Sequence, residues 1–431
     1  MAKQDTRDQK HAKLNGVLLL LGLSVFVNYI DRANLSVAAP LLKNELALSS
    51  SQLGILLSAF FWTYAGMQPV VGWLVDRFEV KWVFALGFLL WSGATAVTAA
   101  VQGFAALLLM RIILGIGESV AYPSYCKIFA THFEENRRGL ANSVIGAGQA
   151  FGPGVGILIG GFVVTALGWR PFFLAVGLSS MLWLLPWLRW MPRTSPTVLA
   201  KVYSSSPRLA EFLVHKSAWG TWIALFCTNY FLYFLLTWLP LYLVNERHFS
   251  MQEMATVGGS TFLMAGASSL MCGHISDRLI SAGSTATRVR KTFLISGTTC
   301  IGLFMAGVVL VPRFSVWLLI LAGTAFGSVN SNQNAITQTL AGPHAAGRWM
   351  GIQNFVGNLA GWVAPTLTGF MIQSTGHYGW PFIIVAAVTW IGTLDWLFLV
   401  GRVEPVIWKT QFASGRAEFP TISSEPSTPV R

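Results

Sequence analysis

Four ionisable side chains lie inside long apolar stretches in the first third of the chain: Asp31, Arg32, Arg111 and Glu118. One charge without a partner at the centre of a bilayer costs about 2.5–3.5 kcal/mol, so four would cost on the order of 10 kcal/mol. These groups must therefore face protein, water or each other. The planar fork of a buried arginine matches a carboxylate, and a carboxyl group stripped of water can carry a proton at physiological pH. Purely structural pairing of two acids with two bases is the simpler alternative.

The spacing of these residues narrows their roles. Arg111 and Glu118 are seven residues apart, so two helical turns place them on one face, about 10.5 Å apart along the axis. Counted from residue 102, Arg111 falls about 13 Å into its segment, near the centre of a core of about 30 Å, and Glu118 lies nearer the cytoplasmic side. Asp31 and Arg32 are neighbours and point about 100° apart, so they cannot pair well on one helix. We expect each of them to find a partner in another helix, a substrate or a proton.

Composition indicates that membrane-spanning helices position these charges. The 431 residues are 54% hydrophobic and 11% charged, whereas soluble domains have roughly 25% charged residues. A span needs about 20 apolar residues, and the backbone in lipid must pair internally, so long continuous apolar runs indicate helices and not barrel strands. We predict an all-α polytopic membrane protein with twelve transmembrane helices near residues 15–39, 52–75, 82–101, 103–126, 139–167, 170–190, 218–243, 252–275, 292–311, 314–340, 349–373 and 380–400.

The placement of Lys and Arg predicts the orientation. With both termini in the cytoplasm, 23 of the 29 Lys and Arg residues fall in inner segments and four in outer loops, which leaves Arg32 and Arg111 within the membrane. This bias explains the net charge of +12 without a nucleic-acid partner. The short outer loops contain no Asn-x-Ser/Thr acceptor, so we expect a multi-pass protein of a bacterial inner membrane. No heptad or interface pattern demands an oligomer, and a monomer is expected.

Matching segments at a nearly constant offset indicate an internal duplication. Residues 72–77 match residues 273–278 at an offset of 201, and Arg138 matches Arg348 at 210. Residues 168–172 resemble residues 379–382 at about 211. Such repeats predict two pseudo-symmetric six-helix halves with a substrate site between them near the bilayer midplane. The predicted parts are a cytoplasmic tail (1–14), the first half (15–190), a cytoplasmic central loop (191–217), the second half (218–401) and a second cytoplasmic tail (402–431).

These features resemble a known family. The paired G-x-x-x-D-R loops and the layout of two six-helix halves resemble the major facilitator superfamily. Residues 28–32, 111–123, 238–240 and 354–359 resemble its anion:cation symporter branch, which includes bacterial sugar-acid carriers such as the galactonate carrier, sialin and the vesicular glutamate transporters. The resemblance covers essentially the whole chain apart from its tails. Two departures stand out: Glu79 replaces a usual glycine, and the polar run 330–334 stands where sugar-acid relatives often have a tryptophan.

The resemblance supports the roles that the charges suggest. Arg32 and Arg111 are expected to bind a substrate carboxylate, while Asp31 and Glu118 are expected to take up and release a coupling proton. By resemblance, further residues would line the substrate cavity, although each could instead make a hydrogen bond between helices: Tyr29, Tyr64, Gln149 and Asn354. By the same resemblance, a cytoplasmic latch would hold the halves together in the outward-facing state: Asp76, Arg77, Asp277 and Arg278.

Other polar residues within spans have open roles. Tyr233, Asn229 and residues 330–334 are candidate readers of substrate hydroxyls, with a structural role as the alternative. Asp395 is the lone acid of the last span, where snorkelling toward the interface explains it as well as a function does. The four cysteines lie singly in apolar segments without metal-ligand spacing, so we expect no metal and no cofactor other than the coupling proton.

Together these observations predict a secondary active transporter that couples proton symport to an organic anion, such as an aldonate, hexuronate or aldarate. An anion exchanger or uniporter and a drug:proton antiporter on the same fold remain alternatives, as does a sensor that binds ligand without moving it. An intramembrane enzyme is not expected, because the His-Glu-x-x-His and Gly-x-Gly-Asp motifs are absent and no histidine lies beside a candidate nucleophile within the spans.

Overall fold

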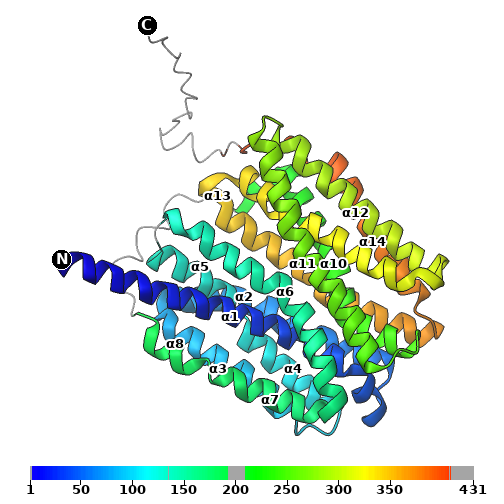
Figure 1. Ribbon diagram of the computed structural model, residues 1–431. Helices are drawn as coiled ribbons and strands as arrows, with labels where there is room; N and C mark the ends of the chain where they lie inside the picture. The colour runs from blue at the N-terminus through cyan, green and yellow to red at the C-terminus, as the bar shows by residue number, and fades with distance from the viewer. Residues whose placement is uncertain (1, 134, 193–208, 407, 409–431) are drawn as a thin grey trace.

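The computed structural model describes residues 2–133, 135–192, 209–406 and 408. Nearly all of this part of the chain is helical, as predicted (Figure 1). The first half contains α1 (Ala2–Glu45), α2 (Ser50–Arg77), α3 (Val80–Thr98), α4 (Phe104–Glu118), α5 (Ala121–His132), α6 (Glu135–Leu167), α7 (Trp169–Met181) and α8 (Leu184–Trp190). The second contains α9 (Leu209–Val214), α10 (Lys216–Asn245), α11 (Met251–Ser281), α12 (Ala286–Leu310), η2 (Pro312–Phe314), α13 (Ser315–Thr375) and α14 (Gly379–Phe398).

Eleven helical segments in the described part of the chain are long and apolar enough to cross a membrane. They coincide with eleven of the twelve predicted spans. The predicted span 252–275 also forms a long helix, α11, but its many Gly, Ser and Thr residues make it less apolar than the others. It packs against α6 and α13, so protein surrounds part of its polar surface. The chain is therefore a multi-pass membrane protein.

The helices break at places that the apolar runs do not reveal. The predicted span 103–126 is divided between α4 and α5 at residues 119–120, and the predicted span 170–190 between α7 and α8 at residues 182–183. The predicted spans 314–340 and 349–373 instead join in α13, where Gly342 alone departs from helical geometry, with φ 66° and ψ 174°. Glycine tolerates this positive φ, and Pro343 removes one backbone donor at the same point.

The two sets of helices form separate groups that meet along a limited set of contacts. Within the first group α1 packs on α6, and α3 packs on α4 and α7; within the second, α13 packs on α10, α11 and α12. In Figure 1 the blue and cyan helices lie beside the yellow and orange ones. The groups touch mainly where α2 meets α13, α6 meets α11 and α1 meets α10. Most of the predicted central loop, residues 193–208, lies outside the described residues.

Glycines make the contact between the two groups unusually close. A Cβ atom added to Gly54 of α2 would lie 2.7 Å from the carbonyl oxygen of Pro365 and 3.1 Å from the Cα of Gly369, both on α13. One added to Gly259 of α11 would lie 2.8 Å from the Cβ of Leu158 on α6. Small residues of this kind let membrane helices approach backbone to backbone. We call Gly54, Gly259 and Gly369 the glycine seam; Gly54 and Gly369 lie near the end of the bundle that is predicted to face outward.

A further glycine fixes the crossing of α2 and α4, the helix that carries Arg111 and Glu118. The Thr63 hydroxyl donates to the carbonyl oxygen of Ile112 at 2.9 Å, and a Cβ on Gly115 would overlap the carbonyl oxygen of Phe60. We expect Gly115→Ala to destabilise the protein by about 1–3 kcal/mol, because overpacking at a rigid backbone contact outweighs the gain in helix propensity of about 1 kcal/mol. Thermal unfolding of the purified variant in detergent measures this.

Gly66→Ala is the matched control for Gly115→Ala. Gly66 also lies within a helix, α2, but no heavy atom stands within 4 Å of its added Cβ. Its substitution should leave the unfolding temperature unchanged or raise it slightly. Equal unfolding temperatures for the two variants would contradict the proposed close crossing.

Candidate functional site

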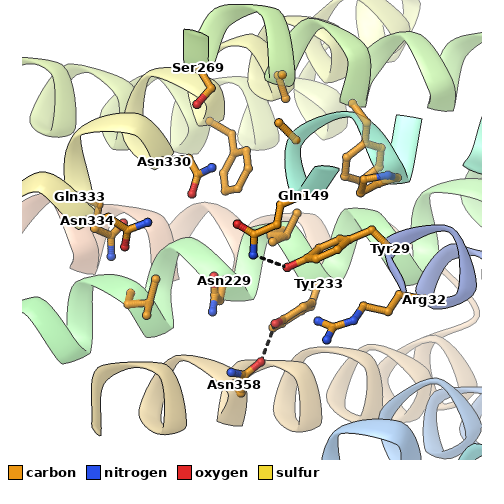
Figure 2. A pocket seen from close by; sticks show the side chains of 18 of the residues that line it. Tyr29, Arg32, Gln149, Asn229, Tyr233, Ser269, Asn330, Gln333, Asn334 and Asn358 are labelled. Carbon is orange, nitrogen blue, oxygen red and sulfur yellow. Dashed lines mark hydrogen bonds between the residues drawn. The ribbon is translucent and has the colours of Figure 1, made fainter. Parts of the chain in front are cut away.

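A cavity of about 110 Å³ lies between the two groups of helices. This is roughly ten times the space of about 10–15 Å³ that one water molecule needs, so the cavity can hold a hydrated polar ligand. Its walls come from both groups: α1, α2, α5 and α6 on one side, and α10, α11 and α13 on the other (Figure 2). The site therefore lies where the internal duplication predicts it.

Arg32 is the charged residue of this cavity. Its Nε donates to Oε2 of Glu118 at 3.2 Å, and the two side chains are 3% and 0% exposed. The guanidinium carbon also lies 4.6–5.0 Å from the ring centres of Tyr29, Phe60 and Tyr64. Such cation–π contacts hold a guanidinium in place without using its N–H groups. Its Nη2 is buried without a hydrogen-bond partner, so Arg32 retains a donor for an anion in the cavity.

Glu118 and Asp31, the two acids within the apolar spans of the first half, each have one carboxyl oxygen with a hydrogen-bond partner and one without. Glu118 ends α4, and its Oε1 is buried without a hydrogen-bond partner. Asp31 accepts hydrogen bonds at Oδ1 from Asn34 (2.9 Å) and from Thr95 (3.3 Å), while its Oδ2 has no partner. Asp31 does not line the cavity. Arg32 lines the cavity and Asp31 does not, as expected for neighbours that lie on different faces of one helix.

Arg111 lies outside the cavity wall in this structure. Its Nε donates to the carbonyl oxygen of Leu56 at 3.3 Å, and its guanidinium carbon lies 5.4 Å from the ring centre of Phe60. The same ring contacts Arg32. Phe60 therefore contacts both buried arginines, and only Arg32 reaches the cavity. The predicted contact of Arg111 with substrate stays a prediction.

The other predicted cavity residues lie on the wall. Gln149 donates from Nε2 to the Tyr29 hydroxyl at 3.2 Å, which joins α6 to α1. Tyr64 and Asn354 complete the predicted set. Of the candidate readers of substrate hydroxyls, five also line the cavity: Asn229, Tyr233, Asn330, Gln333 and Asn334.

Three polar lining residues were not predicted: Tyr122, Ser269 and Asn358. Asn358 accepts a hydrogen bond from the Tyr233 hydroxyl at 2.7 Å. It lies one helical turn after Asn354, so the helical period could have revealed it. The Tyr122 hydroxyl has no hydrogen-bond partner, which makes it available to a ligand.

The predicted latch residues lie at the ends of α2 and α11. Arg77 is exposed, and its guanidinium carbon lies 5.9 Å from the ring of Trp73. Asp277 pairs with Arg290 of its own group at 3.8 Å, and Arg278 is exposed. The side chain of Asp76 lies outside what the structure describes. A latching role for all four remains a prediction.

Asp395 is buried and not snorkelled. Its side chain in α14 is 3% exposed, and both carboxyl oxygens lack hydrogen-bond partners. It does not line the cavity. Among the described residues, no group of three or more His, Cys, Asp or Glu side chains could hold a metal ion.

Comparison with known proteins agrees with this architecture. Residues 21–365 match the family model described as Major Facilitator Superfamily. The chain is 28% identical to a protein named as a probable galactarate/D-glucarate transporter of Bacillus subtilis, over 92% of this chain and 93% of the relative. It is also 28% identical to the hexuronate transporter of Bacillus subtilis, over 94% and 97% of the two chains.

A solved structure shares the fold. It is a bacterial homologue of the human lysosomal transporter Spinster, in an inward-facing and occupied conformation, with a TM-score of 0.75. The match covers 89% of this chain and 96% of the other, at 18% identity. The resemblance to sugar-acid carriers that the motifs predict is confirmed by the named relatives.

Proposed function

The chain belongs to the major facilitator superfamily, and we propose that it is a proton-coupled symporter of an organic anion of sugar-acid size. Members of this family are transporters, so the chain is not an enzyme, and its relatives carry organic acids. The observation that carries the proposal is the buried guanidinium of Arg32, which faces a polar cavity with an unused donor. A planar guanidinium matches a carboxylate in charge and geometry.

Glu118 and the substrate carboxylate would compete for Arg32. While Glu118 is charged, it holds the guanidinium through the contact at 3.2 Å. A proton on Glu118 removes that charge and frees Arg32 for the substrate. Proton uptake would thereby promote substrate binding, and proton release would promote substrate dissociation. Asp31, which is buried on another face of the same helix, would be a second proton acceptor.

The conformation supports transport by alternating access. The glycine seam closes the end that is predicted to face outward, while Arg77 and Arg278 are exposed at the other end. We propose that this is an inward-facing state, that both termini are cytoplasmic, and that the membrane is a bacterial inner membrane. The proposed unit is a monomer of two halves, with boundaries as predicted above and no cofactor besides the proton.

The composition of the cavity argues against export of organic cations. Among the described lining residues, the charged side chain is an arginine and none is Asp or Glu. A drug:proton antiporter for cations would need an acid there. Exchange or uniport of the same anion needs no proton, so the coupling experiment distinguishes it from symport.

Uptake into proteoliposomes tests the proposal. A panel of radiolabelled aldonates, hexuronates and aldarates is offered with and without an inward proton gradient. We expect one class to accumulate above its external concentration only when the gradient is present. Uptake without accumulation would indicate a uniporter, and uptake only against internal anion would indicate an exchanger. No movement or binding of any acid would overturn the organic-anion proposal.

A further inference from the structure

Three amides on one face of the first part of α13, before the interruption at Gly342, line the cavity: Asn330, Gln333 and Asn334. Their spacing of three and four residues places them on adjacent turns. Asn332 does not line the cavity, and its Nδ2 donates to the carbonyl oxygen of Ser328 at 3.0 Å. Only one face of the polar run 330–334 therefore lines the cavity.

Of these three amides, Gln333 is the one that is buried with no hydrogen-bond partner for its side chain. Its side chain is 2% exposed, and neither its Nε2 nor its Oε1 has a hydrogen-bond partner. A buried amide without partners costs about 1–3 kcal/mol, and at a cavity wall a bound ligand can supply those partners. An amide offers a donor and an acceptor side by side, which is the complement of a hydroxyl group.

The charge of the cavity wall lies at one side. Arg32 and Tyr29 lie at one side of the pocket in Figure 2, and Gln333 and Asn334 lie at the other, with Gln149 between them. Among the described lining residues, Arg32 alone carries a full charge. A carboxylate beside Arg32 would be paired, but a second carboxylate at the α13 side would be buried without a cation, which is strongly unfavourable.

We propose that Gln333 reads a hydroxyl group at the far end of the substrate and that the cavity therefore selects a hydroxylated monocarboxylate over the corresponding dicarboxylate. This inference rests on the proposed function of the cavity as an anion site. Sequence identity does not distinguish a monocarboxylate from a dicarboxylate substrate, because the chain is 28% identical both to a hexuronate transporter and to a probable galactarate/D-glucarate transporter.

A pair of substrates that differ at one carbon tests the selectivity. D-Galactonate ends in a hydroxymethyl group where galactarate has its second carboxylate. We expect the purified protein to transport galactonate with a kcat/KM at least 10-fold above that for galactarate, measured as initial uptake and as mutual competition. Equal or better transport of galactarate would overturn the inference while leaving the organic-anion proposal intact. If no acid in the panel binds or moves, it is the proposed function that fails.

A matched pair of variants tests the role of Gln333. Gln353 lies on the same helix, is 1% exposed, and also has two unpartnered amide atoms, but it lies outside the cavity wall. Gln333→Leu should raise KM for galactonate at least 10-fold with little change in kcat, whereas Gln353→Leu should leave KM unchanged. Both changes remove an unsatisfied buried amide, so neither should impair folding, and detergent gel filtration checks this.

A substitution that adds a cation at position 333 should extend uptake to the dicarboxylate. Gln333→Lys places a cation at the α13 side, and we expect it to shift the ratio of galactarate to galactonate uptake by at least 10-fold toward galactarate. An unchanged KM in Gln333→Leu, or an unchanged ratio in a folded Gln333→Lys protein, would overturn the assignment of Gln333.

Discussion

Arg32→Ala should lower kcat/KM for uptake more than 100-fold. The substitution removes the cation that binds the substrate carboxylate, and charged hydrogen bonds contribute about 1.5–3 kcal/mol each. It also leaves Glu118 buried without the guanidinium 3.2 Å away, and breaking a buried pair costs about 3–5 kcal/mol. A loss of even 3 kcal/mol exceeds a factor of 100. Initial uptake rates in proteoliposomes, at matched protein content, measure the effect.

Two further variants separate charge from geometry. Arg32→Lys keeps the charge but loses the planar fork and the five donors, so we expect intermediate activity. Arg170→Ala is the control for loss of an arginine: Arg170 pairs with Glu45 at 2.8 Å, but the two side chains are 36% and 46% exposed. Such a surface pair contributes about 1 kcal/mol or less, and uptake should be unchanged. Arg32→Ala with uptake near that of the unaltered protein would refute the carboxylate-binding role.

Glu118→Gln should abolish uphill accumulation while preserving exchange of labelled for unlabelled substrate. The amide has nearly the same shape and can still accept the hydrogen bond from Arg32, but it cannot carry the coupling proton. Because the competing charge is gone, substrate affinity should rise or stay constant. The accumulation ratio should fall to about one at any proton gradient. Parallel measurements of gradient-driven uptake and of counterflow in the same vesicles test both halves of this expectation.

The dependence on pH provides an independent check of the same role. In the unaltered protein, uptake should slow as the pH on the substrate side rises, because fewer molecules carry the proton that frees Arg32. In Glu118→Gln this dependence should weaken. Glu45→Gln, at the exposed ion pair, should keep the normal dependence. If Glu118→Gln still accumulates substrate against its gradient, Glu118 is not the coupling group, and Asp31→Asn becomes the variant to examine.

The helices were predictable from the sequence because lipid requires long apolar runs with internally paired backbones. Their breaks were not predictable. The runs through residues 119–120 and 182–183 stay apolar or small, so composition there does not distinguish a break from a continuous helix. At Gly342 the sequence Gly-Pro indicates an interruption, but not that helical geometry resumes at once on both sides. Hydropathy indicates whether a segment lies in lipid or in water, but it carries little information on the backbone angles within that segment.

The charged part of the site was predictable in identity but not in full arrangement. Helical spacing correctly separated Asp31 from Arg32, since Asp31 bonds to Asn34 outside the cavity wall and Arg32 lines the cavity. The same reasoning predicted a depth for Arg111 that suits a substrate contact, but in this structure Arg111 lies against Phe60 and Leu56 of α2. Which neighbouring helix a given face meets depends on packing between segments distant in sequence. Gln333 illustrates the same limit, because five consecutive polar residues hide which of them face the cavity.

The glycine seam has a consequence for how this sequence can vary. Gly54 and Gly369 face each other so closely that any side chain on either would strike the backbone of the opposite helix. Natural variants at these two positions should therefore be rare, and a change at one should not be rescued by shrinking the other, which is already glycine. A laboratory variant with a bulky residue at position 54 would instead hold this end open. Such a protein would be a suitable antigen for raising antibody fragments that recognise a single conformer.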